Sequence, residues 1–390
     1  MSEPPDSPQA LVELLKARGE LRDPRIEAAF LAIPRALFLP DLPPEQVYAD
    51  AAIPIKSGPE GAVFSSSSQP SMMAIMLEQL QLEPGHNVLE IGTGTGYNAA
   101  IMAHIVGPRG RVTTVEIDRA IADNARTHLQ KAKMGVVTVV EGDGALGYPP
   151  RAAYDRIIAT AGIWDVPRMW RQQLKRGGIL VAPIWLEGMQ YSAAFHLQAD
   201  GSLLSIDNFP CGFIPLRGVS AGPELHVRVG SGLLLQSSDA ARLDSAALQT
   251  MLSEDASSGH LGVFLSAAEF AHSLIPFIAL NLPDGLIFAS YSTSVNQQPF
   301  GIEGSGFALL AQGSACFVPM QEAGKAIVFG GADMLLAAQD LVSAWQGAGA
   351  PSAAQLRLRL IPREQPLLRA PGRVFTRADH HLYAWLEGAS

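Results

Sequence analysis

Asn-Val-Leu-Glu-Ile-Gly-Thr-Gly-Thr-Gly, residues 87–96, is the stretch that decides the fold. Its first part, Val88–Ile91, is a short apolar run with one acid, typical of a buried parallel strand. The turn that follows has glycine at every second position: Gly92, Gly94 and Gly96. Residues 97–106 then have helical spacing. A strand, a glycine turn and a helix start form a site where a ligand can lie against bare backbone, because glycine has no Cβ atom.

Acidic residues at the ends of two later strands indicate which kind of ligand the turn binds. The expected strand 111–116 ends in Glu116, where a carboxylate can accept both hydroxyls of a ribose. The expected strand 136–140 runs into Asp143, which can accept from an adenine amino group. The dinucleotide fingerprint needs a third glycine where Tyr97 stands, so a nucleoside without pyrophosphate fits better than NAD. We expect S-adenosylmethionine, bound by Glu90, Gly92, Thr93, Gly94, Gly96, Glu116, Asp143 and Gly144. An ordinary glycine turn in a doubly wound domain is the alternative interpretation.

Length and composition set the broad class. A chain of 390 residues predicts two domains. No run approaches the eighteen or more apolar residues of a membrane span, and the start has no pattern of a signal peptide. Two cysteines without a zinc motif favour a cytoplasmic protein with no metal. A net charge of −9 without a long basic run argues against a nucleic-acid partner.

A run of serines precedes the glycine turn. Residues 64–70 read Phe-Ser-Ser-Ser-Ser-Gln-Pro, and residues 71–82 then have the pattern of a helix. An isolated serine run is usually a flexible loop. A hydroxyl-rich loop at a helix start is also a good receptor for a carboxylate, because hydroxyls and free backbone N–H groups both point at it.

Strands and helices alternate beyond Asp143. Strands are expected at 155–159 and 179–183, and a terminal pair at 191–197 and 203–209. This order predicts an α/β fold with a mostly parallel sheet and an antiparallel edge. The remainder, 219–390, indicates a small α+β domain, with one weak strand at 225–235 and a clear one at 356–361.

Residues from about 30 to 218 resemble protein-L-isoaspartate O-methyltransferases. The matching motifs are Ser68-Gln69-Pro70, Val88–Tyr97, Gly142–Gly144, Tyr154–Ile158, Gln173-Leu174 with Gly177-Gly178, and Phe213–Leu216. The resemblance implies a Rossmann-like S-adenosylmethionine-dependent methyltransferase domain, with an N-terminal helical cap, over residues 1–218. We expect the domain at 219–390 to serve substrate recognition or assembly.

Two departures from the family concern the substrate. The family usually has Thr-Ile-Ser where this chain has Ser66-Ser67-Ser68, which changes the substrate-facing loop. The chain is also far longer than the usual repair enzyme. Long relatives act in ribosomal-peptide modification (RiPP biosynthesis), where they methylate an aspartate that then forms a succinimide and isoaspartate. The serine loop and the long tail resemble that branch.

We therefore expect methyl transfer to the carboxylate of an aspartate or isoaspartate in a peptide or protein. Ser68 is the residue expected to orient this carboxylate, with Ser66 or Ser67 assisting. We favour a dedicated ribosomal precursor peptide, because a repair enzyme needs no addition as long as 219–390. The alternatives are repair of isoaspartate in damaged proteins, a cofactor-binding scaffold without activity, and a methyltransferase for small molecules or nucleic acid.

Overall fold

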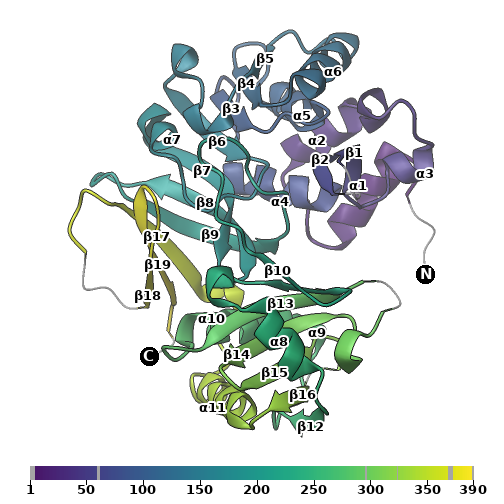
Figure 1. The fold of residues 1–390 in the computed structure, drawn as a ribbon. Helices are drawn as coiled ribbons and strands as arrows, with labels where there is room; N and C mark the ends of the chain where they lie inside the picture. The colour runs from purple at the N-terminus through teal and green to yellow at the C-terminus, as the bar shows by residue number, and fades with distance from the viewer. Residues whose placement is uncertain (1–4, 59–61, 295–296, 323, 368–371, 389–390) are drawn as a thin grey trace.

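The computed structural model describes residues 5–58, 62–294, 297–322, 324–367 and 372–388. Two large β-sheets dominate these residues, one of ten strands and one of seven (Figure 1). None of the helices in these ranges combines the length and the apolar character needed to span a lipid bilayer.

The ten-stranded sheet has the order β18-β19-β17-β9-β8-β7-β6-β3-β4-β5. Neighbouring strands from β7 to β5 pair in parallel, and those from β7 to β18 pair antiparallel. The strands that the sequence predicts for this sheet are β3 (Asn87–Ile91), β4 (Arg111–Glu116), β5 (Val137–Glu141), β6 (Tyr154–Ala159), β7 (Leu174–Leu186), β8 (Met189–Leu197) and β9 (Leu203–Cys211). The predicted α/β fold with its parallel strands is therefore confirmed, but the expectation of a mostly parallel sheet is wrong: β17, β18 and β19 extend the antiparallel side, so five of the ten strands lie there.

The glycine turn lies at the centre of this sheet. Strand β3 has β4 on one side and β6 on the other, and its residues from Val88 to Ile91 are buried. Because both faces of a central parallel strand are covered, an apolar run is stable there. The covering helices are α4 (Pro70–Leu80), α5 (Tyr97–Val106), α6 (Arg119–Lys131) and α7 (Arg168–Gln173).

The N-terminal segment forms a helical cap over α5. It consists of α1 (Pro8–Ala17), α2 (Pro24–Ala32), the short helices η1 (Arg35–Phe38) and α3 (Pro44–Val47), and the hairpin of β1 (Ile53–Ser57) and β2 (Val63–Ser67). The rings of Phe30 and Phe38 lie 6.2 and 5.4 Å from the ring of Tyr97, the first residue of α5. The cap and the glycine turn therefore share one apolar core.

The seven-stranded sheet is antiparallel throughout, in the order β10-β11-β13-β14-β15-β16-β12. Its strands are β10 (His226–Val229), β11 (Leu233–Gln236), β12 (Ser257–His260), β13 (Ile287–Thr293), β14 (Ser305–Ala311), β15 (Ser314–Pro319) and β16 (Lys325–Gly330). The main helices here are α8 (Ser245–Leu252), α10 (Ile275–Asn281) and α11 (Asp333–Gly347). The single strand expected at 225–235 is wrong: the chain turns back at Gly230 and Gly232, both at positive φ, and forms the hairpin β10–β11.

The end of the chain returns to the ten-stranded sheet. Strand β17 (Leu356–Pro362) was expected inside the C-terminal α+β domain, but it pairs with β9 and with β19 (His380–Leu386). The short edge strand β18 (Arg373–Thr376) completes the sheet, and Figure 1 shows these yellow strands beside β9. Asn208 Nδ2 donates to the Leu356 carbonyl at 2.7 Å, so side chains join the two segments as well. The sheet thus runs across the boundary expected after residue 218, and that division stays a prediction.

Candidate active site

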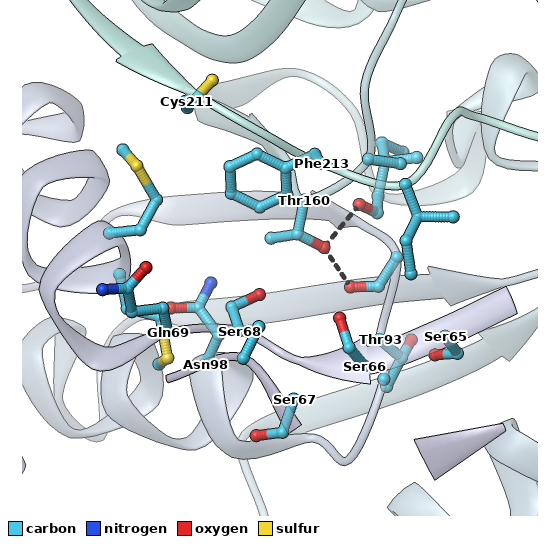
Figure 2. A pocket seen from close by; sticks show the side chains of 18 of the residues that line it. Ser65, Ser66, Ser67, Ser68, Gln69, Thr93, Asn98, Thr160, Cys211 and Phe213 are labelled. Carbon is cyan, nitrogen blue, oxygen red and sulfur yellow. Dashed lines mark hydrogen bonds between the residues drawn. The ribbon is translucent and has the colours of Figure 1, made fainter. Parts of the chain in front are cut away.

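A cavity of about 520 Å³ lies at the carboxyl ends of the central strands, within the range of about 300–1,000 Å³ that is usual for ligand pockets. Its walls are the glycine turn after β3, the serines of β2, Thr160 and Ala161 after β6, and the segment 209–217, which forms the end of β9 and continues beyond it (Figure 2). In open α/β sheets, ligands bind at this end of the strands. The cavity therefore brings the predicted glycine turn and serine loop into one site.

Close packing explains Gly92, and positive φ angles favour glycine at all three positions of the turn. A Cβ atom on Gly92 would lie 2.6 Å from Thr160 Oγ1, and the residue has a φ of +93°. Thr160 Oγ1 itself donates to the Gly92 carbonyl at 2.8 Å (Figure 2). A Cβ on Gly94, at a φ of +53°, would lie 3.4 Å from the Ser66 carbonyl. The turn is thus packed between the end of β6 and the serine loop.

Glu116 lies at the end of β4 and faces the glycine turn. Its Oε2 atom accepts from the backbone N–H groups of Thr93 at 3.2 Å and Gly94 at 3.3 Å. Its Oε1 atom accepts from the Asp118 N–H at 3.1 Å, and the Arg217 guanidinium lies 3.8 Å away. A carboxylate has about four acceptor positions, so Glu116 retains capacity for a ligand donor.

Glu90 and Asn98 place two unpaired acceptors in the pocket wall. Glu90 has no exposed surface, and its Oε1 atom accepts from Asn98 Nδ2 at 2.8 Å. Burial raises the pKa of the Glu90 carboxyl to about 7, although the side chains of Thr114 and Asn98 oppose this shift. Glu90 Oε2 and Asn98 Oδ1 are buried without a hydrogen-bond partner among the described residues. These oxygens suit a bound ligand that carries a cationic donor.

The three candidate serines do not all face the cavity. Figure 2 shows the hydroxyls of Ser66 and Ser68 on the side towards Thr160, and Ser67 turned the other way. Ser67 is 4% exposed and its Oγ accepts from the Arg35 guanidinium at 3.3 Å. The assisting role of Ser67 stays a prediction: its oxygen already accepts from Arg35, and only its O–H group is left for a substrate. Ser67 nevertheless belongs to the residues that line the cavity, so a serine in place of the family's isoleucine changes the pocket wall.

Asp143 is held by backbone groups. Its carboxylate accepts from the Ala145 N–H at 2.9 Å and from the Val219 N–H at 2.8 Å. Its neighbour Gly144 lines the cavity, whereas Asp143 does not belong to the lining. The predicted contact with an adenine amino group therefore stays a prediction, and it needs one of the remaining acceptor positions of this carboxylate.

Sequence reasoning missed several residues of the site. Thr160 could have been found, because it directly follows a predicted parallel strand and such ends converge. Asn98 could also have been found, because it lies two residues after Gly96, and a polar side chain so close to the glycine turn indicates a ligand contact. No sequence signal pointed to Gln190 on β8. Its side chain accepts from the Phe213 N–H at 2.7 Å and donates to the Phe213 carbonyl at 3.0 Å, and these two bonds hold the wall formed by residues 209–217.

The pocket has the groups that S-adenosylmethionine requires. Glu116 can accept from ribose hydroxyls, the bare turn at Gly92 and Gly94 admits close approach, and the unpaired oxygens of Glu90 and Asn98 match an ammonium group. Fold and site together define an S-adenosylmethionine-dependent methyltransferase.

Comparison with known proteins gives the family. Residues 6–221, more than half of the chain, match the family model described as protein-L-isoaspartate(D-aspartate) O-methyltransferase. This chain belongs to that family, and it is an S-adenosylmethionine-dependent carboxyl O-methyltransferase.

Individual relatives agree with this assignment. The protein-L-isoaspartate O-methyltransferase of Methanopyrus kandleri is 43% identical over 211 residues, which are 54% of this chain and 91% of the relative. The enzyme of the same name from Pyrococcus horikoshii is 39% identical over 212 residues, 53% of this chain and 91% of the relative. A solved structure of a protein-L-isoaspartate O-methyltransferase, 26% identical, aligns with 90% of this chain and 96% of its own length at a TM-score of 0.52.

Proposed function

We propose that this protein methylates the free carboxylate of an L-isoaspartyl residue in damaged proteins, the first step of their repair. The observation that supports this most is the coverage of the relatives: enzymes of that name align over about nine tenths of their own length. This chain therefore contains a region that corresponds to nearly the full length of these relatives.

Chain length does not favour the dedicated-peptide reading. The sequence favours a ribosomal precursor peptide because the chain continues far beyond residue 218. A solved protein-L-isoaspartate O-methyltransferase, however, aligns with 90% of this chain, so a long tail also occurs under that name. The expectation that length marks a peptide-modifying enzyme thus loses its main argument, and the repair alternative is the better supported one.

In the proposed reaction, one group of pocket residues binds the cofactor and the serine loop orients the substrate. Glu116 and the glycine turn hold the cofactor, with Glu90 and Asn98 accepting from its ammonium group. S-adenosylmethionine, when bound, supplies a methyl group activated by its sulfonium charge. The Ser68 hydroxyl, assisted by Ser66, donates to the substrate carboxylate and aligns one oxygen for attack. Neither hydroxyl has a hydrogen-bond partner among the described residues, so both are available to the substrate.

This reaction needs orientation and little acid–base help. A carboxylate with an ordinary pKa near ~4 is already ionised at neutral pH. Its attack depends on near-contact geometry, which can contribute a large part of the rate enhancement. Phe213 and the serines line the cavity, and a site that excludes water would favour a step in which opposite charges are neutralised. Neutral hydroxyls therefore suit the site better than a general base.

A peptide assay tests the proposal. The protein is incubated with S-adenosylmethionine labelled in its methyl group and with either an isoaspartyl hexapeptide or the same peptide containing aspartate. We expect base-labile label on the isoaspartyl peptide at a kcat/KM at least a hundredfold above that for the aspartyl peptide. Equal rates, or transfer to the aspartyl peptide alone, would exclude repair and restore the dedicated-peptide reading. Calorimetric binding of the cofactor without transfer to either peptide would support the scaffold alternative.

We propose in addition that residues 219–390 meet the peptide substrate or serve assembly. This part of the chain begins beside the pocket, since the Val219 amide is bonded to Asp143 next to the lining residue Gly144. An isoaspartyl peptide carrying a photoreactive group at one end tests substrate contact. We expect labelled residues beyond 219; labels confined to earlier residues would favour assembly.

A further inference from the structure

Arg35, the first residue of η1, is a buried cation to which the proposed chemistry gives no task. Its side chain has no exposed surface. Burying a guanidinium is costly unless its N–H groups find acceptors. The acceptors that this chain provides therefore show what the residue is built to hold.

The guanidinium joins two segments that are distant in sequence. Its Nη1 atom donates to the carbonyls of Val47 at 2.8 Å and Ala49 at 3.3 Å. Its Nη2 atom donates to the Ser68 carbonyl at 2.9 Å and to Ser67 Oγ at 3.3 Å. One rigid, planar group thus ties the serine loop to the end of α3 and the residues after it, a geometry that the flexible ammonium of lysine does not reproduce.

The charge of Arg35 persists despite burial. Burial lowers its pKa to about 10, while the nearby Tyr97, Asp50 and Tyr48 oppose that shift. The group therefore stays protonated at neutral pH. Its guanidinium carbon lies 6.0 Å from the ring centroid of Tyr97, which directly follows Gly96. The same group thus lies between the serine loop and the start of α5.

The backbone of Ser68 needs such a restraint. The Ser68 hydroxyl has no hydrogen-bond partner among the described residues, so the backbone of Ser68 decides where it points before the substrate arrives. Arg35 bonds directly to the carbonyl of this residue.

We propose that Arg35 is a positioning residue for methyl transfer. It fixes the backbone of Ser67 and Ser68 so that the Ser68 hydroxyl meets the substrate carboxylate in the orientation required for attack. This inference rests on the proposed function. A displacement of the hydroxyl by a fraction of an ångström lowers the rate, because near-attack geometry is lost. Cofactor affinity should change less than kcat, because among the described residues the hydrogen bonds of Arg35 go to Val47, Ala49, Ser67 and Ser68 and none goes to the glycine turn or to Glu116.

A matched pair of buried arginines makes the test specific. Arg377 is 3% exposed, and burial lowers its pKa to about 10 as well. It stacks 3.3 Å from the ring centroid of Trp164 and donates to the Trp185 carbonyl at 3.2 Å, and it contacts no serine of the loop. The variants are Arg35→Met, Arg35→Lys and Ser67→Ala, with Arg377→Met as the control. Each is measured for kcat and KM with the isoaspartyl peptide, for cofactor Kd by calorimetry, and for Tm.

We expect Arg35→Met to lower kcat at least tenfold while cofactor Kd stays within twofold of the wild type. Arg35→Lys recovers part of the loss, and Ser67→Ala, which disturbs the fold least, lowers kcat by about two- to fivefold. Arg377→Met lowers Tm but leaves kcat within twofold. An unaltered kcat in Arg35→Met and Ser67→Ala, or an equal loss of kcat in Arg377→Met, overturns the inference.

Hydrogen exchange of the amides of residues 65–69 separates the two proposals. If the wild type transfers no methyl group to an isoaspartyl peptide, the proposed function fails, but the positioning role can still be judged. Faster exchange in Arg35→Met than in Arg377→Met supports a restraint of the serine loop by Arg35. Equal exchange in the wild type and Arg35→Met refutes it.

Discussion

Replacing Gly92 with alanine tests how tightly the cofactor turn is packed. The added Cβ atom would lie 2.6 Å from Thr160 Oγ1, well inside van der Waals contact, and the residue would have to keep a φ of +93°. Thr160 cannot withdraw freely, because its hydroxyl donates to the carbonyls of Gly92 at 2.8 Å and Ile91 at 3.2 Å. The substitution therefore combines backbone strain with a steric clash.

The two effects can be given magnitudes. A left-handed backbone costs a residue with a Cβ atom roughly 1–2 kcal/mol. Overpacking of a filled site costs typically about 1–3 kcal/mol. We expect Gly92→Ala to lower the free energy of unfolding by about 2–5 kcal/mol. Movement of Thr160, which lines the cavity, should weaken cofactor binding at least tenfold, or about 1.4 kcal/mol.

Gly85 provides a matched control. It has a φ of +88°, close to that of Gly92, but a Cβ atom there would find nothing within 4 Å. Gly85→Ala should therefore show only the strain, roughly 1–2 kcal/mol, with unchanged cofactor affinity. The double variant Gly92→Ala/Thr160→Ala removes the clashing oxygen. Compared with Thr160→Ala alone, it should lose no more stability than Gly85→Ala does.

Urea unfolding gives the stabilities, and calorimetry with S-adenosylmethionine gives the affinities. The reasoning is refuted if Gly92→Ala is as stable as Gly85→Ala and binds the cofactor like the wild type. It is also refuted if removal of the Thr160 hydroxyl gives no recovery, because the clash would then lie elsewhere.

Three further predictions concern the serine, the buried acid and the end of the chain. Ser68→Ala should lower kcat roughly 10–100-fold, the equivalent of one hydrogen bond to a charged group, with cofactor Kd unchanged; unaltered turnover would remove Ser68 from the mechanism. Burial raises the pKa of Glu90 from 4.5 to about 7, so the folded state holds an extra proton between these values. Wild-type stability should therefore fall by on the order of 3 kcal/mol as the pH rises through this window, and the same urea titration of Glu90→Gln should lack that slope. Ending the chain at residue 355 removes β17–β19 and uncovers the edge of β9, so we expect a lower Tm and association in size-exclusion chromatography; a monomer with wild-type Tm would contradict this.

The sequence by itself determined the local units of the site. The strand at 88–91, the glycine turn and the helix at 97–106 follow one another directly, so hydrophobic spacing and glycine positions were sufficient to predict them. Glu116 could be placed beside this turn because carboxyl ends of parallel strands converge at one edge of a sheet. The alternation of strands and helices along the chain was sufficient to predict the α/β fold.

Only the tertiary structure decided which distant groups meet. Arg35 reaches Ser67 and Ser68 across more than thirty residues, and Asp143 is bonded to the Val219 amide. Strand β17 pairs with β9 some 150 residues earlier, although its alternating pattern predicted the strand itself. Periodicity reports which face of an element is buried, but it does not specify the partner. That choice arises when whole elements dock and most buried polar groups find an acceptor or a donor.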